Sequence, residues 1–66
     1  SGRTPPALIG AFLKHPVLSV QMAATETGAS APACLRNITL FADRGLVRET
    51  TGQGRYRFWT IAGPGG

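Results

Sequence analysis

Apolar residues recur at helical spacing three times along the chain and then give way to two short β-rich segments. The first predicted helix is capped by Thr4 and ends near Lys14 or His15, because Pro16 cannot continue it. Prolines at its start are tolerated, since the first turn has no use for their missing N–H groups. Its apolar face consists of Leu8, Ile9, Phe12 and Leu13.

Two further helices follow, each with a recognisable start and stop. Ser19 caps a helix that runs to about Glu26, and Gly28 ends it in a left-handed conformation. Ser30 caps the next, which runs to about Arg44 and stops at Gly45. The inward face of the first of these helices comprises Val20, Ala23, Ala24 and Thr27, and that of the second Cys34, Ile38 and Phe41.

The segments 46–51 and 55–61 are rich in β-branched and aromatic residues and predict a hairpin with its turn at 51–54. Residues 17–18 could add a brief third strand. Both faces of the last segment are apolar; we expect Trp59 and Ile61 to face the core. The fold class is therefore α+β, mostly α, and the expected core comprises Leu8, Phe12, Ala24, Cys34, Ile38, Phe41, Leu46 and Trp59.

The second and third helices carry the spacing of a helix-turn-helix. Two helices that cross steeply need a small residue on the first, and Ala24 meets that need. The turn needs a residue that tolerates positive φ, which Gly28 supplies. Cys34 supplies a small apolar side chain that reaches under the preceding helix. The spacing becomes more specific because an arginine-bearing hairpin follows at once.

Length and composition limit what else the chain can do. Its 66 residues hold one small domain, and the net charge of +4 favours a polyanionic partner. The lone Cys34 favours a core role in a reducing compartment, so we expect a cytoplasmic protein. No apolar run approaches a membrane span. We expect a tail or cloning remnant at 1–4, the folded domain at 5–61 and a flexible tail at 62–66.

The chain has few of the residues that catalysis or metal binding requires. One histidine and one cysteine do not supply the usual four ligands of zinc, so we expect no cofactor. Glu26, Asp43 and Glu49 are the only acids, and no Ser-His-acid set is convincing. His15 near a helix end has a ready structural role beside the helix dipole. The sequence therefore predicts a binding module and not an enzyme.

Two stretches carry a resemblance to a known family: "HPVLSVQMAATETGAS" and "GLVRETTGQGRYRFW". Together they resemble the winged helix-turn-helix domains appended to the C-terminal ends of larger bacterial proteins, some behind Fic-type domains and others behind domains of unknown function. The resemblance covers roughly residues 7–61. It implies a DNA-binding module, here of a transcriptional regulator.

The resemblance implies that the third helix enters the major groove of DNA and that the hairpin acts as a wing on the backbone. The implied DNA-facing positions are Ser30, Ala31, Pro32, Leu35, Arg36 and Thr39 on the helix, and Arg48, Gln53, Arg55 and Arg57 on the hairpin. The chain departs from the usual pattern because Ala31, Pro32, Ala33 and Leu35 are apolar. Arg36 is the best candidate to read a base edge.

The sequence is compatible with two functions. The first is binding of double-stranded DNA, which the hairpin arginines favour. The second is a winged-helix protein-interaction module, docking on a partner or a parent domain through Leu35 and Leu40. The fold alone does not separate them.

Overall fold

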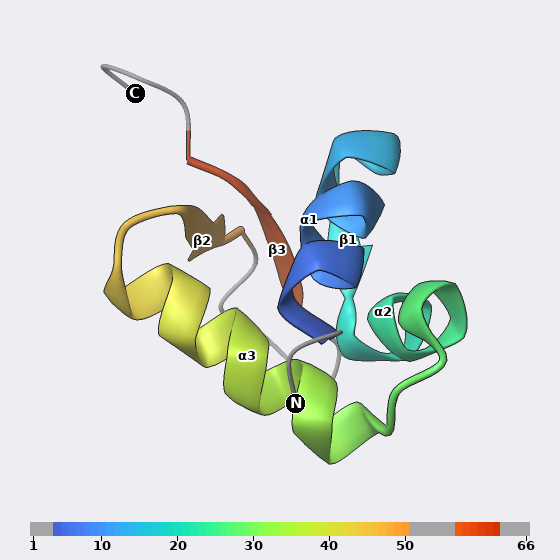
Figure 1. Ribbon diagram of the computed structural model, residues 1–66. Coiled ribbons are helices and arrows are strands. Elements are labelled where there is room, and N and C mark those ends of the chain that lie inside the picture. The colour runs from blue at the N-terminus through green and yellow to red at the C-terminus, as the bar shows by residue number, and fades with distance from the viewer. Residues whose placement is uncertain (1–3, 51–56, 63–66) are drawn as a thin grey trace.

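The computed structural model describes residues 4–50 and 57–62, which form three α-helices and three short strands. The predicted α+β class, mostly α with a winged helix-turn-helix arrangement, is confirmed (Figure 1). The elements in chain order are α1 (Thr4–Lys14), β1 (Leu18–Ser19), α2 (Val20–Thr27), α3 (Ala31–Asp43), β2 (Val47–Glu49) and β3 (Phe58–Ile61).

The predicted starts of the second and third helices are confirmed by their hydrogen bonds. The Ser19 Oγ accepts from the Met22 backbone N–H at 3.1 Å, and the Ser30 Oγ accepts from that of Ala33 at 3.3 Å. Each hydroxyl satisfies a backbone donor that the helix itself leaves unpaired. Gly28 ends α2 with φ of 76°, the left-handed conformation that the sequence predicts.

The end of α3 explains where the following strand begins. Gly45 has φ of 75° and donates its N–H to Ala42 O, while Leu46 donates to Phe41 O. This pair of bonds is a Schellman motif, which satisfies the last carbonyls of a helix. Because Leu46 still belongs to this helix end, β2 begins only at Val47.

β3 is the central strand of a three-stranded antiparallel sheet with the order β1-β3-β2 (Figure 1). The register places Leu18 opposite Trp59 on one side, and Glu49 opposite Trp59 on the other. The predicted third strand is confirmed, although it comprises Leu18 and Ser19 and not Val17. The predicted turn at 51–54 lies outside the described residues.

The core lies among the three helices and one face of the sheet. Leu8, Leu18 and Ile38 are fully buried, as is the free Cys34 that the sequence assigned to the core. The remaining buried apolar residues are Ala11, Phe12, Ala23, Val47 and Trp59.

Part of the predicted core is wrong. Leu46 is 52% exposed, and its neighbour Val47 is buried in its place, because the Schellman turn shifts the strand by one residue. On α2 the fully buried alanine is Ala23, whereas Ala24 is only half-buried. Phe41 is also half-buried and packs against the edge of the core.

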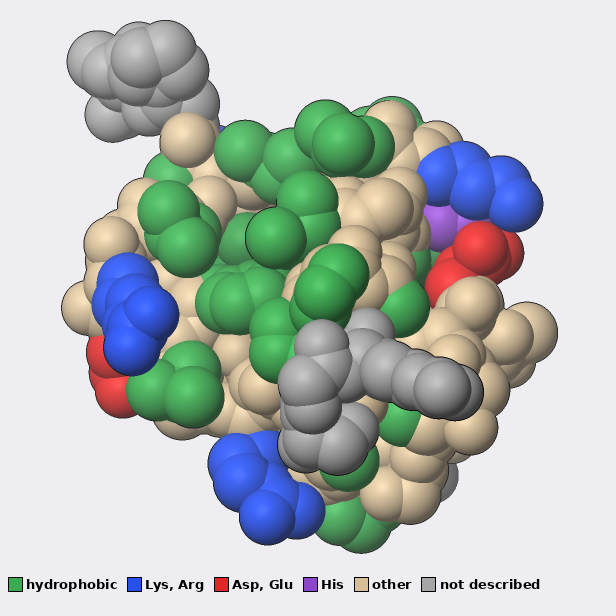
Figure 2. All heavy atoms as spheres, viewed as in Figure 1, with side chains coloured by type: hydrophobic (Ala, Val, Ile, Leu, Met, Phe, Trp, Pro, Cys, Tyr) green, Lys and Arg blue, Asp and Glu red, His purple; other side chains and the backbone are tan. Residues whose placement is uncertain are grey.

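The predicted apolar face of α1 is only half correct. Leu8 and Phe12 are buried, but Ile9 and Leu13 are 51% and 74% exposed. On β3, Trp59 is buried as predicted, while Ile61 is 43% exposed. Exposed apolar side chains gather on the face shown in Figure 2, over α1, the end of α3 and β3. The fold therefore leaves an apolar surface that periodicity assigned to the core.

Candidate nucleic-acid interface

The turn between α2 and α3 is held by Thr27, a residue that the sequence placed only on the inward face of α2. Its hydroxyl donates to Ala23 O at 2.8 Å and accepts from the Ala29 N–H at 3.1 Å. The same oxygen lies 3.5 Å from the buried Cys34 Sγ on α3. Thr27 thus links both helices of the helix-turn-helix across the glycine turn.

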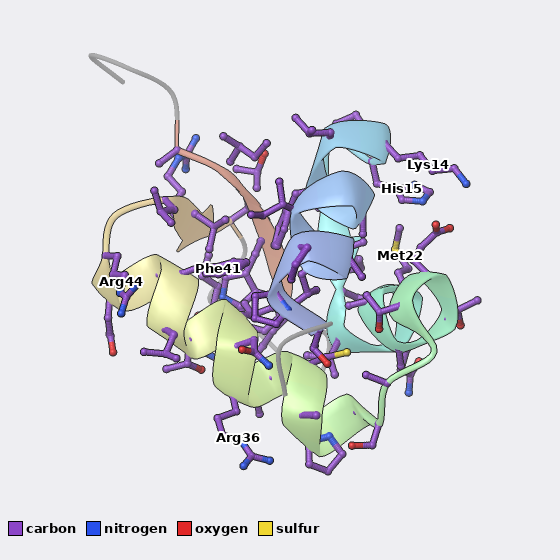
Figure 3. All side chains as sticks on the ribbon, in the orientation of Figure 1. Lys14, His15, Met22, Arg36, Phe41 and Arg44 are labelled. Atoms are coloured by element: carbon purple, nitrogen blue, oxygen red, sulfur yellow. The ribbon has the colours of Figure 1, made fainter. Side chains whose placement is uncertain are left out.

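The outward surface of α3 is largely as the sequence placed it. The six candidate positions on this helix and its cap, Ser30, Ala31, Pro32, Leu35, Arg36 and Thr39, are all exposed. Figure 3 shows Arg36 extending from α3 away from α1, whereas Phe41 lies between α3 and the rest of the fold. The helix therefore presents one cation on a mostly apolar exposed face.

Two other polar side chains of α3, Thr39 and Asn37, are hydrogen-bonded to their own helix. Thr39 Oγ1 donates to Leu35 O at 2.8 Å, and Asn37 Nδ2 donates to Ala33 O at 2.9 Å. Ser30 already accepts the capping bond from Ala33. Among the side chains that could read a base, Arg36 makes no hydrogen bond or ion pair with any described residue.

A groove of about 590 Å³ joins α3 to the last strand. Ala31 and Leu35 line it from α3, Phe58 lines it from the start of β3, and Arg57 lines it from the position just before β3. The N-terminal turn of α2 closes the groove, with the exposed Gln21 on its wall. The structure thus brings the outward face of α3 and one hairpin arginine to a shared surface.

Arg57 is not a free cation in this structure. Its Nε and Nη2 donate to the two carboxylate oxygens of Glu49 at 2.8 and 2.9 Å, a forked pair. Its guanidinium carbon also lies 4.9 Å from the ring centre of Trp59. The hydrogen bond from Arg57 lowers the pKa of the Glu49 carboxyl, and that carboxylate raises the pKa of Arg57. The pair is solvent-exposed, so it positions Arg57 more than it stabilises the fold.

The remaining hairpin positions differ in what the structure shows of them. Arg48 is exposed on β2 and lies opposite Thr60. It has no carboxylate partner among residues 4–50 and 57–62. Gln53 and Arg55 lie outside the described residues.

A family model described as "HTH DNA binding domain" matches residues 5–62, nearly the whole chain. The chain belongs to this HTH DNA-binding family. It is not a family of enzymes, and the helix-turn-helix geometry around Thr27 and Gly28 agrees with the assignment. No curated protein matches the chain.

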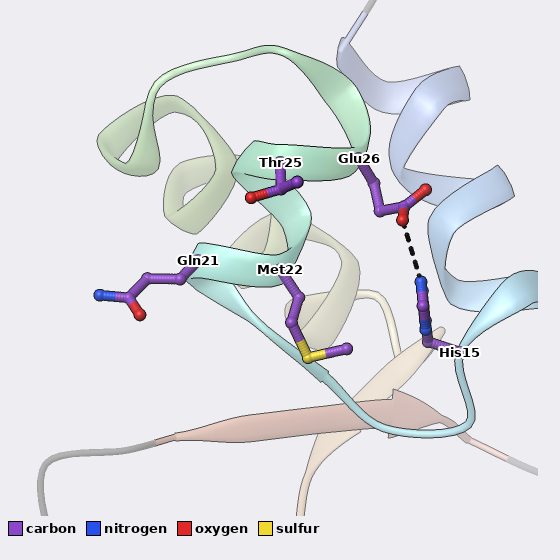
Figure 4. Close-up of a pocket in the computed structure, with 5 residues that line it drawn as sticks. All are labelled: His15, Gln21, Met22, Thr25 and Glu26. Carbon is purple, nitrogen blue, oxygen red and sulfur yellow. Dashed lines mark hydrogen bonds and ion pairs between the residues drawn. The ribbon is translucent and has the colours of Figure 1, made fainter.

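The HTH domain has a second polar cluster, on the side of α2 away from α3. His15 Nε2 lies 3.1 Å from Glu26 Oε2 (Figure 4). Lys14 Nζ lies 3.4 Å from Glu26 Oε1. The hydrogen bond from His15, followed by the charge of Lys14, lowers the pKa of Glu26. These contacts tie the end of α1 to α2.

Sequence reasoning missed three residues of the HTH domain that matter for this surface. Gln21 and Phe58 line the groove, and Glu49 holds Arg57. A signal existed for Gln21, since a polar residue in the first turn of the helix before a recognition helix is well placed near a bound duplex. The pairing of Glu49 with Arg57 gave no such signal, because it depends on strand register.

Within residues 4–50 and 57–62, no group of three or more His, Cys, Asp or Glu side chains could hold a metal ion. None of the three described helices is long and apolar enough to cross a membrane.

Proposed function

We propose that this domain binds double-stranded DNA in the cytoplasm as the DNA-binding module of a bacterial transcriptional regulator. In this proposal α3 enters the major groove and the hairpin arginines contact the backbone. The observation that carries it is the outward Arg36 on the same helix that shares a groove with Arg57. The DNA-facing set would be the ten positions named from the sequence, with Gln21 added.

The exposed arginines of the domain support different roles, with base contact at one position and phosphate contact at another. Arg36 can donate two parallel hydrogen bonds to a guanine edge. Arg48 is exposed and can contribute phosphate contacts. Phosphate contacts release counterions, so binding would weaken steeply with added salt.

The apolar part of α3 favours modest sequence preference. Ala31, Pro32 and Leu35 have no hydrogen-bonding groups at the positions that usually read bases, although apolar side chains can contact a thymine methyl group. Thr39 is already bonded to its own helix. We therefore expect a small difference in affinity between a preferred duplex and a random one.

The proposal is tested by titrating the labelled protein with short duplex DNA and following backbone amide shifts at two salt concentrations. We expect shifts at α3, at the first turn of α2 and at the hairpin, with weaker binding at the higher salt. Shifts that avoid both α3 and the hairpin would rule out this mode of DNA binding.

One observation favours a second candidate, a winged-helix protein-interaction module. Leu35 and Leu40 are both exposed on α3, where a purely phosphate-binding helix would carry polar residues. An absence of duplex-induced shifts at low salt would make this candidate the leading one. Leu35 and Leu40 would then be the first positions to vary.

Glu49 is expected to restrain DNA binding, because its carboxylate occupies the donors that Arg57 would offer to a phosphate. Glu49→Gln should release the cation, strengthen binding and steepen the salt dependence by about one unit in log K against log salt. Binding measured by fluorescence anisotropy over a salt series checks this.

Glu26→Gln is the matched control for Glu49→Gln. It changes the net charge by the same amount, but it frees Lys14 and His15 at the α1–α2 contact and leaves Arg57 paired. Equal gains in the two variants would show that net charge alone matters and that Arg57 has no specific role.

A further inference from the structure

A second exposed surface lies between α1 and the end of α3, and we call it the α1–α3 groove. It has a volume of about 220 Å³ and is lined by Ile9, Phe12, Phe41, Leu46, Val47 and Ile61. These side chains belong to the apolar face that Figure 2 shows over α1, α3 and β3. Every lining residue is apolar.

Several large apolar side chains of this face are exposed to solvent. Ile9 and Leu46 are each about half exposed, and Leu13 lies one helical turn beyond Ile9 on the same side of α1. Contiguous apolar surface on a small soluble protein commonly marks an interaction site. Arg36 extends in a different direction from Phe41, so a partner seated here would leave Arg36 free (Figure 3).

The face carries both halves of a self-complementary contact. Leu13 is the most exposed of the large apolar side chains described, at 74%, and it stands beside a groove with room for a leucine side chain. A two-fold axis would place Leu13 of each copy in the groove of the other. Because one face carries both the projecting Leu13 and the groove that can receive it, two copies of the same chain can bind each other.

The charges next to the groove also favour a second copy of the chain as the partner. Asp43 and Arg44 are adjacent at the end of α3, just before Leu46, and both are exposed. Neither has an ion-pair partner within 4–50 and 57–62. Neighbouring charges of opposite sign can pair reciprocally across a two-fold axis, whereas an acidic or a basic partner would be repelled by one of them.

We propose that the α1–α3 groove is a self-association surface that binds a second copy of this chain. A stable interface covers about 800 Å² on each partner, which is roughly a fifth of the 4477 Å² surface of the protein. We expect the contact to include the charged neighbours of the groove, and the dimer to be weak and reversible. This association does not depend on the DNA-binding proposal and can be tested without DNA.

Sedimentation equilibrium of the 66-residue chain over a range of concentrations tests the proposal. We expect a monomer–dimer equilibrium, and Leu13→Glu should weaken it at least about tenfold, because each dimer loses two buried leucines and gains two buried carboxylates. Leu40→Glu is the matched control, since Leu40 is exposed on α3 but does not line the groove. It should leave the equilibrium unchanged.

A dilution series followed by amide shifts locates the contact without any substitution. Shifts that depend on concentration should cluster at Ile9, Leu13, Leu46 and Ile61. A protein that stays monomeric up to about 1 mM would overturn the proposal. Equal weakening by Leu13→Glu and Leu40→Glu, or shifts confined to the outward face of α3, would overturn it too.

Discussion

Replacing Leu8 with alanine is expected to destabilise the domain by about 2–5 kcal/mol. Leu8 is fully buried at the centre of the apolar cluster, so the shorter side chain leaves a cavity among all three helices. A domain of 66 residues has a free energy of unfolding of only about 3–10 kcal/mol. The substitution is therefore expected to remove a large part of the stability or to unfold the chain.

Chemical denaturation followed by Trp59 fluorescence measures this effect, since Trp59 is the only tryptophan and is 2% exposed. Leu13→Ala is the matched control, because it makes the same change on the same helix at an exposed position. It should change the free energy of unfolding by no more than about 0.5 kcal/mol. The core assignment would be contradicted if the two variants were equally stable.

Replacing Arg36 with alanine is expected to weaken binding to a preferred duplex by about 1–3 kcal/mol and to reduce the preference for that duplex over a random one. Arg36 is the cation on the outward face of α3, and its guanidinium is not engaged by any described carboxylate. Fluorescence anisotropy with two duplexes at one fixed salt concentration measures both effects.

Arg44→Ala provides the control for charge. It removes one arginine from the end of the same helix, where Figure 3 places it far along α3 from Arg36. Arg36→Lys separates charge from geometry, because lysine keeps the cation but loses the two-pronged donor. If Arg36→Ala and Arg44→Ala weaken binding equally, Arg36 acts only through net charge and reads no base.

The two proposed surfaces would bind different partners. DNA would meet the outward face of α3, whereas a second copy would meet the groove that contains Phe41 on its other side. Each copy would then keep its Arg36 available. A dimer of this kind would present two recognition helices, and paired half-sites in DNA commonly match such symmetry.

The sequence by itself determined where the helices begin and end. Ser19 and Ser30 cap α2 and α3, and Gly28 and Gly45 adopt the left-handed conformation that stops them. These signals act within one helical turn, so they do not depend on what the rest of the chain does. The resemblance to the family implied an outward position for Arg36 on α3, and Arg36 is exposed there.

Only the tertiary structure decided which apolar residues are buried and which charges are free. Ile9 and Leu13 share a helix face with buried residues, yet they are exposed because the groove beside α1 is left open in the described part of the fold. Glu49 meets Arg57 because the pairing of β2 with β3 brings the residue just before β3 close to the end of β2. Burial and pairing depend on contacts between residues distant in the chain, which local patterns do not encode.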